Sequence, residues 1–96
     1  MRQSVLRRRL QDLQGRITAL RAEIVILDEQ IAVADDEVSD LRVRALISET
    51  PLAEKEHAEA SRHANLAHRA RDHAFVSLHA LESERDRLIE QLVVEV

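Results

Sequence analysis

Residues 47–55 read ISETPLAEK and lie at the midpoint of a chain that otherwise favours helices. They contain Pro51, the only proline, which has no backbone N–H and biases the residue before it away from helical backbone angles. A helix is therefore expected to end near Glu49. Thr50 can cap a new helix with Pro51 at its first position, where a backbone donor is not needed. The stretch predicts a helix, a tight turn and a second helix.

Residues that are mostly apolar recur at alternating steps of four and three in both halves, but in two different phases. The first seam consists of Leu6, Leu10, Leu13, Ile17, Leu20, Ile24, Leu27, Ile31, Ala34, Val38, Leu41 and Ala45. The second consists of Ala53, His57, Ala60, Ala64, Ala67, Arg71, Ala74, Leu78, Leu81, Arg85, Leu88 and Leu92. Because such seams are typical of coiled coils, the phase change at Pro51 indicates that the chain folds back on itself there.

The predicted fold is all-α, a two-helix antiparallel coiled-coil hairpin. Residues 1–96 form one hairpin, with helix 1 at about 3–49, the turn at about 49–51 and helix 2 at about 51–94. Antiparallel pairing places Leu20 opposite Leu81 and Leu41 opposite Ala60. It also aligns flanking polar residues as Arg21 with Glu82, Arg16 with Glu84, Arg44 with Glu56, Asp35 with His68 and Glu37 with His63. These pairs favour one register and orientation.

Several apolar residues lie outside both seams, where a simple hairpin would be polar. The candidate partner interface consists of Val25, Ile26, Val33, Val43, Ile47, Leu66, Phe75 and Val76. Clusters of exposed apolar residues mark packing surfaces. We expect either a homodimer, most simply a four-helix assembly of two hairpins, or a helical protein partner to cover them.

Composition limits the other possibilities. There is no cysteine, so disulfides and thiolate metal sites are excluded, and a reducing cytoplasm is the expected location. The longest run without a charged residue is about nine residues, too short to cross a membrane. The net charge of −4 argues against direct nucleic-acid binding. The three arginines at 7–9 splay around a helix, which weakens any single basic patch for nucleic acid or an acidic partner and favours a solvated helix start.

No pattern for catalysis or for a metal is present. The five histidines, His57, His63, His68, His73 and His79, follow one another at steps of six, five, five and six. Zinc ligands on one helix need steps of three or four, so no metal site is predicted. His63 and His68 lie opposite Glu37 and Asp35, which leaves pH sensing open. We expect no enzyme, because no nucleophile or phosphate-binding motif occurs.

Residues 4–24, SVLRRRLQDLQGRITALRAEI, resemble a helix of RsiG-type anti-sigma factors. In that family the ligand motif is Glu, three residues, Ser, two residues, Arg, three residues, Gln, three residues and Asp. Two segments match part of this spacing. The first contains Ser4, Arg7 and Gln11, with Gly15 in place of the Asp, and the second contains Asp35, Ser39 and Arg42. These six residues are the candidate ligand-binding set.

The resemblance implies a helical hairpin that sequesters a sigma factor and binds cyclic di-GMP. Arginine can meet a guanine edge or a phosphate, and aspartate can accept from guanine. The expected function is a non-catalytic regulatory binding protein. The alternative is a self-associating structural coiled coil with no small-molecule ligand.

The ligand implied by the resemblance can be tested directly. Calorimetric titration of the chain with cyclic di-GMP is expected to release heat, and replacing Arg7 and Arg42 with alanine is expected to abolish it. Arg62→Ala, outside both partial motifs, is the matched control. Absence of heat for the unmodified chain, alone and with a sigma factor, would contradict the ligand.

Overall fold

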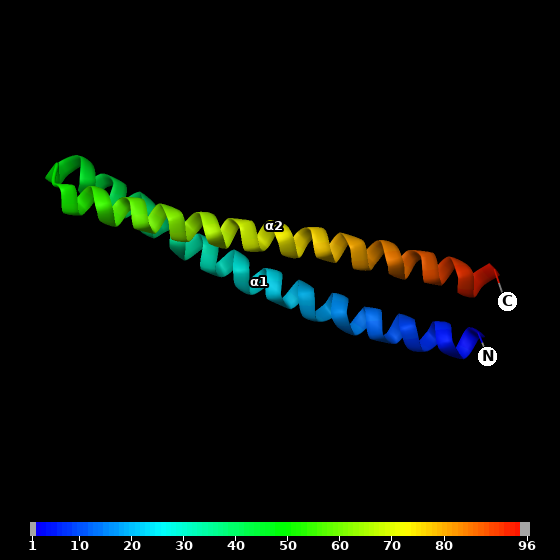
Figure 1. The fold of residues 1–96 in the computed structure, drawn as a ribbon. Coiled ribbons are helices and arrows are strands. Elements are labelled where there is room, and N and C mark those ends of the chain that lie inside the picture. Colours follow the sequence, from blue (N-terminus) through cyan, green and yellow to red (C-terminus); the bar gives the residue numbers. More distant parts are fainter. Residues whose placement is uncertain (1, 95–96) are drawn as a thin grey trace. The chain divides into compact units, whose positions relative to one another are not determined.

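The computed structural model describes residues 2–94, which form two long α-helices joined by a short turn (Figure 1). Helix α1 spans Arg2–Ser48 and helix α2 spans Pro51–Val94. No strand occurs among residues 2–94. The predicted all-α helical hairpin is confirmed.

The turn consists of Glu49 and Thr50, and each has a defined backbone role. Glu49 has a φ of 49°, in the left-handed region that commonly ends helices, and its N–H donates to the Ala45 carbonyl at 3.1 Å. Thr50 Oγ1 accepts a hydrogen bond from the Ala53 N–H at 3.2 Å, and the Thr50 carbonyl accepts from the Glu54 N–H at 3.1 Å. The side-chain bond is the N-cap that the sequence predicted.

The two helices pack together in two compact units. The terminal unit combines residues 2–24 of α1 with residues 73–94 of α2, and the hairpin unit consists of residues 25–72. The hairpin unit contains the turn, drawn in green in Figure 1. Each unit is described separately below.

The terminal unit has a core of large aliphatic side chains. Leu6, Leu13 and Leu88 are buried together, and Leu10, Leu81 and Leu92 pack against them. Ile17 is fully buried, with 0% of its surface exposed. Each such side chain contributes about 1.5–3 kcal/mol of hydrophobic free energy when removed from water, so this core is the main stabilising element of the unit.

The hairpin unit has a slimmer core. Its buried residues are Ile31, Ala34, Ala53 and Ala64. Ala60 and Ala67 of α2 are half-buried, as are Leu27, Val38 and Leu41 of α1. Larger α1 side chains therefore pack against mostly small α2 residues in this unit. Along both helices, every residue of the two predicted seams is buried or half-buried.

The seam predicts where truncation will be most costly. Ile17→Ala removes a fully buried side chain and is expected to lower the free energy of unfolding by about 2–5 kcal/mol. Urea denaturation followed by circular dichroism measures this change. Ile26→Ala is the matched control, because Ile26 is 54% exposed, and it is expected to change stability by less than about 0.5 kcal/mol. Equal losses for the two variants would contradict the seam.

The cap at the turn gives a second stability prediction. Thr50→Ala removes the acceptor of the Ala53 N–H and is expected to cost about 1 kcal/mol in the free energy of unfolding. Thr50→Ser keeps the hydroxyl and is expected to retain most of the stability. A serine variant as unstable as the alanine variant would show that the hydroxyl is not what matters at this position.

Candidate protein-binding site

The hairpin unit has two flanks beside its seam, and one flank carries ion pairs between the helices. His68 Nε2 lies 3.0 Å from Asp35 Oδ1 and 3.1 Å from Oδ2. Arg71 Nε donates to Asp28 Oδ1. Asp28 and Asp35 are seven residues apart, so they lie on the same side of α1. This flank is already occupied by polar contacts within the chain.

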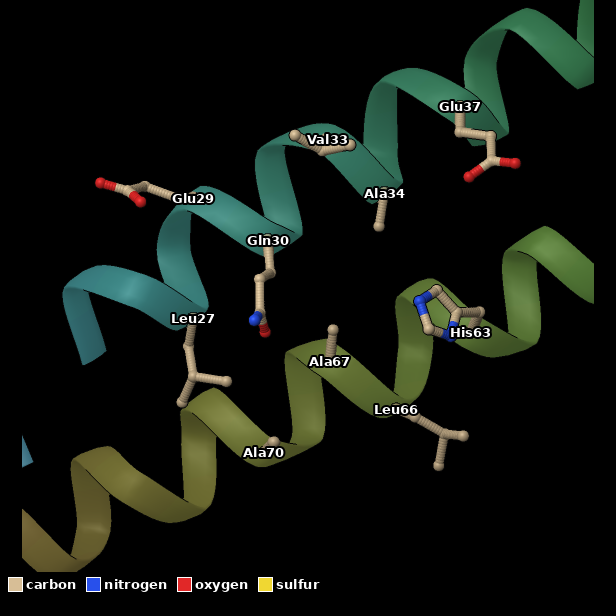
Figure 2. Close-up of a pocket in the computed structure, with 10 residues that line it drawn as sticks. All are labelled: Leu27, Glu29, Gln30, Val33, Ala34, Glu37, His63, Leu66, Ala67 and Ala70. Carbon is tan, nitrogen blue, oxygen red and sulfur yellow. The ribbon is translucent and has the colours of Figure 1, made fainter. Parts of the chain in front are cut away.

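The other flank contains a groove of about 740 Å³ (Figure 2). Its lining residues are Leu27, Glu29, Gln30, Val33, Ala34, Glu37, His63, Leu66, Ala67 and Ala70. Gln30 follows Asp28 by two residues, a rotation of about 200° at 3.6 residues per turn, which places it across the seam from the ion pairs. We call this flank, defined by the groove-lining residues, the groove face.

Two exposed aliphatic side chains stand at the groove. Val33 is 70% exposed and Leu66 is 62% exposed, although both line a hollow between two helices. Figure 2 shows Ala34 and Ala67 with their short side chains in the space between the helices, and Leu66 projecting from α2 away from α1. The alanines leave room that larger side chains would fill. The hollow therefore has small apolar side chains between the helices, with Gln30 projecting beside them, and exposed aliphatic residues at its margins (Figure 2).

A second groove of about 430 Å³ continues the groove face toward the turn. Its lining residues are Glu37, Leu41, Arg44, Glu56, Glu59, Ala60 and His63. Glu37 and His63 line both grooves, so the two hollows are neighbours. Together they are lined by four carboxylates, at Glu29, Glu37, Glu56 and Glu59, and by one guanidinium, at Arg44. Carboxylates therefore line both grooves, and the exposed aliphatic residues Val33 and Leu66 line only the larger one.

The candidate interface residues are all exposed, but the structure distributes them over several surfaces. Val33 and Leu66 line the groove. Ile26 and Ile47 lie seven residues before and fourteen residues after Val33, so they continue its stripe along α1. Val25 and Val43 are out of phase with that stripe. Phe75 and Val76 belong to the terminal unit.

The six candidate ligand-binding residues fall into different units. Ser4, Arg7 and Gln11 belong to the terminal unit, while Asp35, Ser39 and Arg42 belong to the hairpin unit. All six are exposed on α1. Asp35 is already engaged with His68. None of the six lines the groove face.

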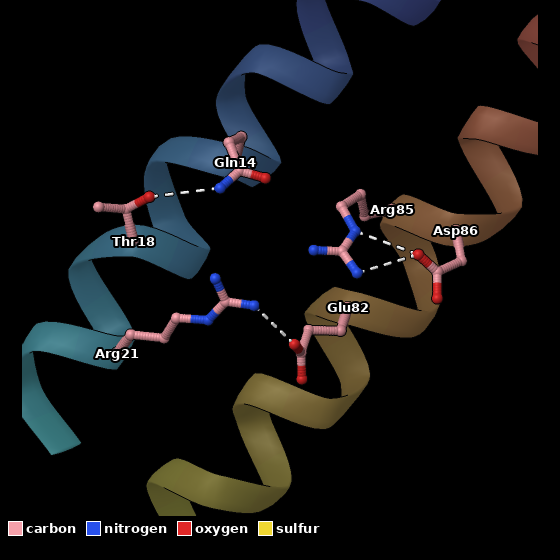
Figure 3. Close-up of polar contacts among 6 residues, drawn as sticks. All are labelled: Gln14, Thr18, Arg21, Glu82, Arg85 and Asp86. Atoms are coloured by element: carbon pink, nitrogen blue, oxygen red, sulfur yellow. Dashed lines mark hydrogen bonds and ion pairs between the residues drawn. The ribbon is translucent and has the colours of Figure 1, made fainter.

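Two of the predicted cross-helix pairs are present and a third is replaced. Arg21 donates to Glu82 at 2.9 Å (Figure 3), and Asp35 pairs with His68. Glu84 pairs with Arg9 at 3.8 Å instead of with Arg16. Arg9 lies about two turns before Arg16, on the same side of α1. Arg16 lines a groove of about 510 Å³ in the terminal unit.

The remaining two predicted pairs lie on the groove face. Arg44 with Glu56 and Glu37 with His63 line the second groove together, but no ion pair joins either pair in the described chain. Arg71 and Arg85, the charged residues of the second seam, extend their heads to carboxylates. Arg71 reaches Asp28 across the seam, and Arg85 reaches its neighbour Asp86 at 3.1 Å (Figure 3). The pairing of Arg71 with Asp28 was missed because it joins a seam position to a flanking one.

Other sites are limited by the geometry of the described residues. Between residues 2 and 94 no group of three or more histidine, aspartate or glutamate side chains is placed to hold a metal ion. Over the same residues neither helix has an apolar stretch long enough to cross a membrane. His79 contacts the ring of Phe75, with 6.3 Å between centroids and 58° between planes. The groove face is therefore the strongest candidate site.

Comparisons with protein-family models, with curated proteins and with solved structures give no match.

Proposed function

We propose that this chain is a non-catalytic regulatory binding protein that holds a helix of a protein partner in the groove of its hairpin unit. The observation that carries the proposal is the pair Val33 and Leu66, two strongly exposed aliphatic residues that line a hollow with an alanine floor. A helix laid in a groove between two helices contributes apolar side chains at every third or fourth position. Such side chains fit the space that the alanines leave.

Hydrophobic burial supplies the driving force for this binding. Burial of apolar surface stabilises a complex by about 25 cal/mol for each Å² removed from water. The flank with the ion pairs is less suited to this role, because a partner there would have to displace or desolvate the contacts of Asp28 and Asp35. The groove face offers the exposed side chains of Val33 and Leu66 for burial, and among the described residues a partner there has no ion pair between the helices to displace.

The finer form of the proposal is an anti-sigma factor that acts in the cytoplasm. It is supported by the resemblance of residues 4–24 to RsiG-type proteins and by the hairpin architecture that this family shares. In this form the bound helix belongs to a sigma factor, and cyclic di-GMP is the regulatory ligand. None of the candidate ligand residues lines the groove face, so in this form the ligand and the partner contact different residues.

Self-association is the second candidate function, and a different observation favours it. Phe75 and Ile89 of the terminal unit are exposed and lie fourteen residues apart, on one side of α2. A second copy of the chain could cover this side and produce a homodimer. Neither Phe75 nor Ile89 lines the groove face.

The binding function predicts that a protein partner depends on the groove. Affinity capture from the native cell is expected to recover one partner in a fixed ratio to the chain. The double change Val33→Glu and Leu66→Glu is expected to lower recovery at least tenfold, because two charges would be buried beneath the partner. Quantitative mass spectrometry of the captured proteins measures the ratio.

Val43→Glu provides the matched control, because Val43 is also an exposed valine of α1 but does not line the groove. Circular dichroism checks that all variants remain helical. Recovery unchanged by the double substitution would reject the groove as the binding site. A mass measurement in solution that gives a dimer, lost with Phe75→Glu and Ile89→Glu, would support self-association.

A further inference from the structure

We infer that the helix taken by the groove face is amphipathic and basic, with an apolar stripe flanked by lysine or arginine. The inference rests on the proposed function and names the chemical class of the partner. It follows from the apolar groove and the carboxylates that surround it on the same face.

The apolar residues of the site determine the spacing of the apolar residues on the partner helix. Val33 of α1 and Leu66 of α2 both line the groove, and Ala67 and Ala70 add small side chains from α2. A partner side chain such as leucine can enter between the two aliphatic edges and contact the alanines. Repetition at steps of three and four keeps successive leucines on one side of a helix, so the partner needs a stripe and not one anchor.

The carboxylates of the site determine which residues should flank the apolar stripe of the partner. Four carboxylates line the two neighbouring grooves, against one guanidinium and the imidazole of His63. Within residues 2–94, Glu29, Glu37 and Glu56 have no ion-pair partner. Glu59 has only a long contact of 4.0 Å with the exposed Lys55. The face therefore has unneutralised negative charge beside its apolar groove.

The spacing of the carboxylates constrains where the partner's cations lie. Glu29 and Glu37 are eight residues apart on α1, which corresponds to about 12 Å along the helix axis at 1.5 Å per residue. Lysines or arginines seven or eight residues apart on the partner helix would span the same distance. Such cations share one side of the partner, beside its apolar stripe.

The same charges disfavour other occupants of this face. A second copy docked about a two-fold axis through the grooves would add four more carboxylates to the same area, which repel those already present. Phosphate groups of a nucleic acid or of an anionic lipid surface would be repelled for the same reason. A basic amphipathic helix is attracted by these charges, and its own apolar side chains can fill the groove.

The test uses a synthetic helical peptide of 18 residues as the probe, built from leucine at steps of three and four, alanine, and lysine at the flanks. A paired peptide has glutamate at every lysine position. Fluorescence anisotropy with the full chain is expected to show that the lysine peptide binds at least tenfold more tightly than the glutamate peptide. Its affinity is expected to fall as salt rises, because exposed charges are screened.

Variants of the chain separate the two halves of the site. Val33→Thr with Leu66→Gln removes apolar contacts at nearly constant size, and it is expected to weaken binding of the lysine peptide roughly tenfold. Glu37→Gln with Glu59→Gln is expected to weaken it several-fold and to flatten its salt dependence. Asp36→Asn and Val43→Thr are the matched controls, because both residues are exposed on α1 and neither lines the grooves.

Three outcomes would overturn the inference. The first is equal affinity for the two peptides, and the second is a Glu37→Gln and Glu59→Gln variant no weaker than Asp36→Asn. The third is binding insensitive to Val33→Thr with Leu66→Gln, which would indicate diffuse charge attraction. These outcomes are distinct from failure of the proposed function. A captured partner that depends on Val33 and Leu66 but not on Glu37 and Glu59 would leave the binding function intact and reject only its basic character.

Discussion

The backbone of Pro51 has no N–H, and the structure of the hairpin depends on how the residues around it accommodate that absence. Glu49 ends α1 in a left-handed conformation, and Thr50 caps α2 through its hydroxyl. Pro51 then occupies the first position of α2, where an N–H would have no partner within the helix. Because only two residues separate the helices, the phase of α2 is set as soon as it begins. The seams of the hairpin unit meet for this reason.

The difference between the two flanks of the hairpin unit follows from where its charges find partners. Asp28 and Asp35 reach Arg71 and His68 across the seam, so the carboxylates of one flank are held in polar contacts within the chain. On the groove face, residues 30 and 70 carry no charge, and no ion pair joins Arg44 with Glu56 or Glu37 with His63 in the described chain. The same hairpin thus presents one flank closed by polar contacts and one flank that is open and partly apolar. The proposed binding function depends on this asymmetry.

Heptad spacing predicted the seams completely. In a helix of 3.6 residues per turn, residues at steps of three and four lie on the same side and face the other helix. Leu27 and Ala67 are examples, as both are shielded as expected. Ion pairs were predicted less well. Arg21 pairs with Glu82 as expected, but Glu84 pairs with Arg9. Long flexible side chains can reach more than one partner, so helix spacing alone does not determine which pair forms.

The candidate site was only partly predictable. Exposure of Val33 and Leu66 follows from their positions outside the seams, but a groove between them depends on the alanines opposite and on the space left unfilled. The spacing of apolar residues also does not separate Val43, on another side of α1, from Val33. Val33 differs from Val43 in lining the groove, and the groove is formed by side chains of both helices.

The short turn also constrains how the length of this protein can change during evolution. One residue inserted within either helix would rotate everything beyond it by about 100°, and leucines would move out of contact while carboxylates moved in. A longer loop could compensate for this rotation by changing its conformation, but a turn of two residues cannot. Lineages of this hairpin should therefore differ by matched gains or losses of seven residues in both arms. A hairpin with a different change in length would need its turn at another position in the chain.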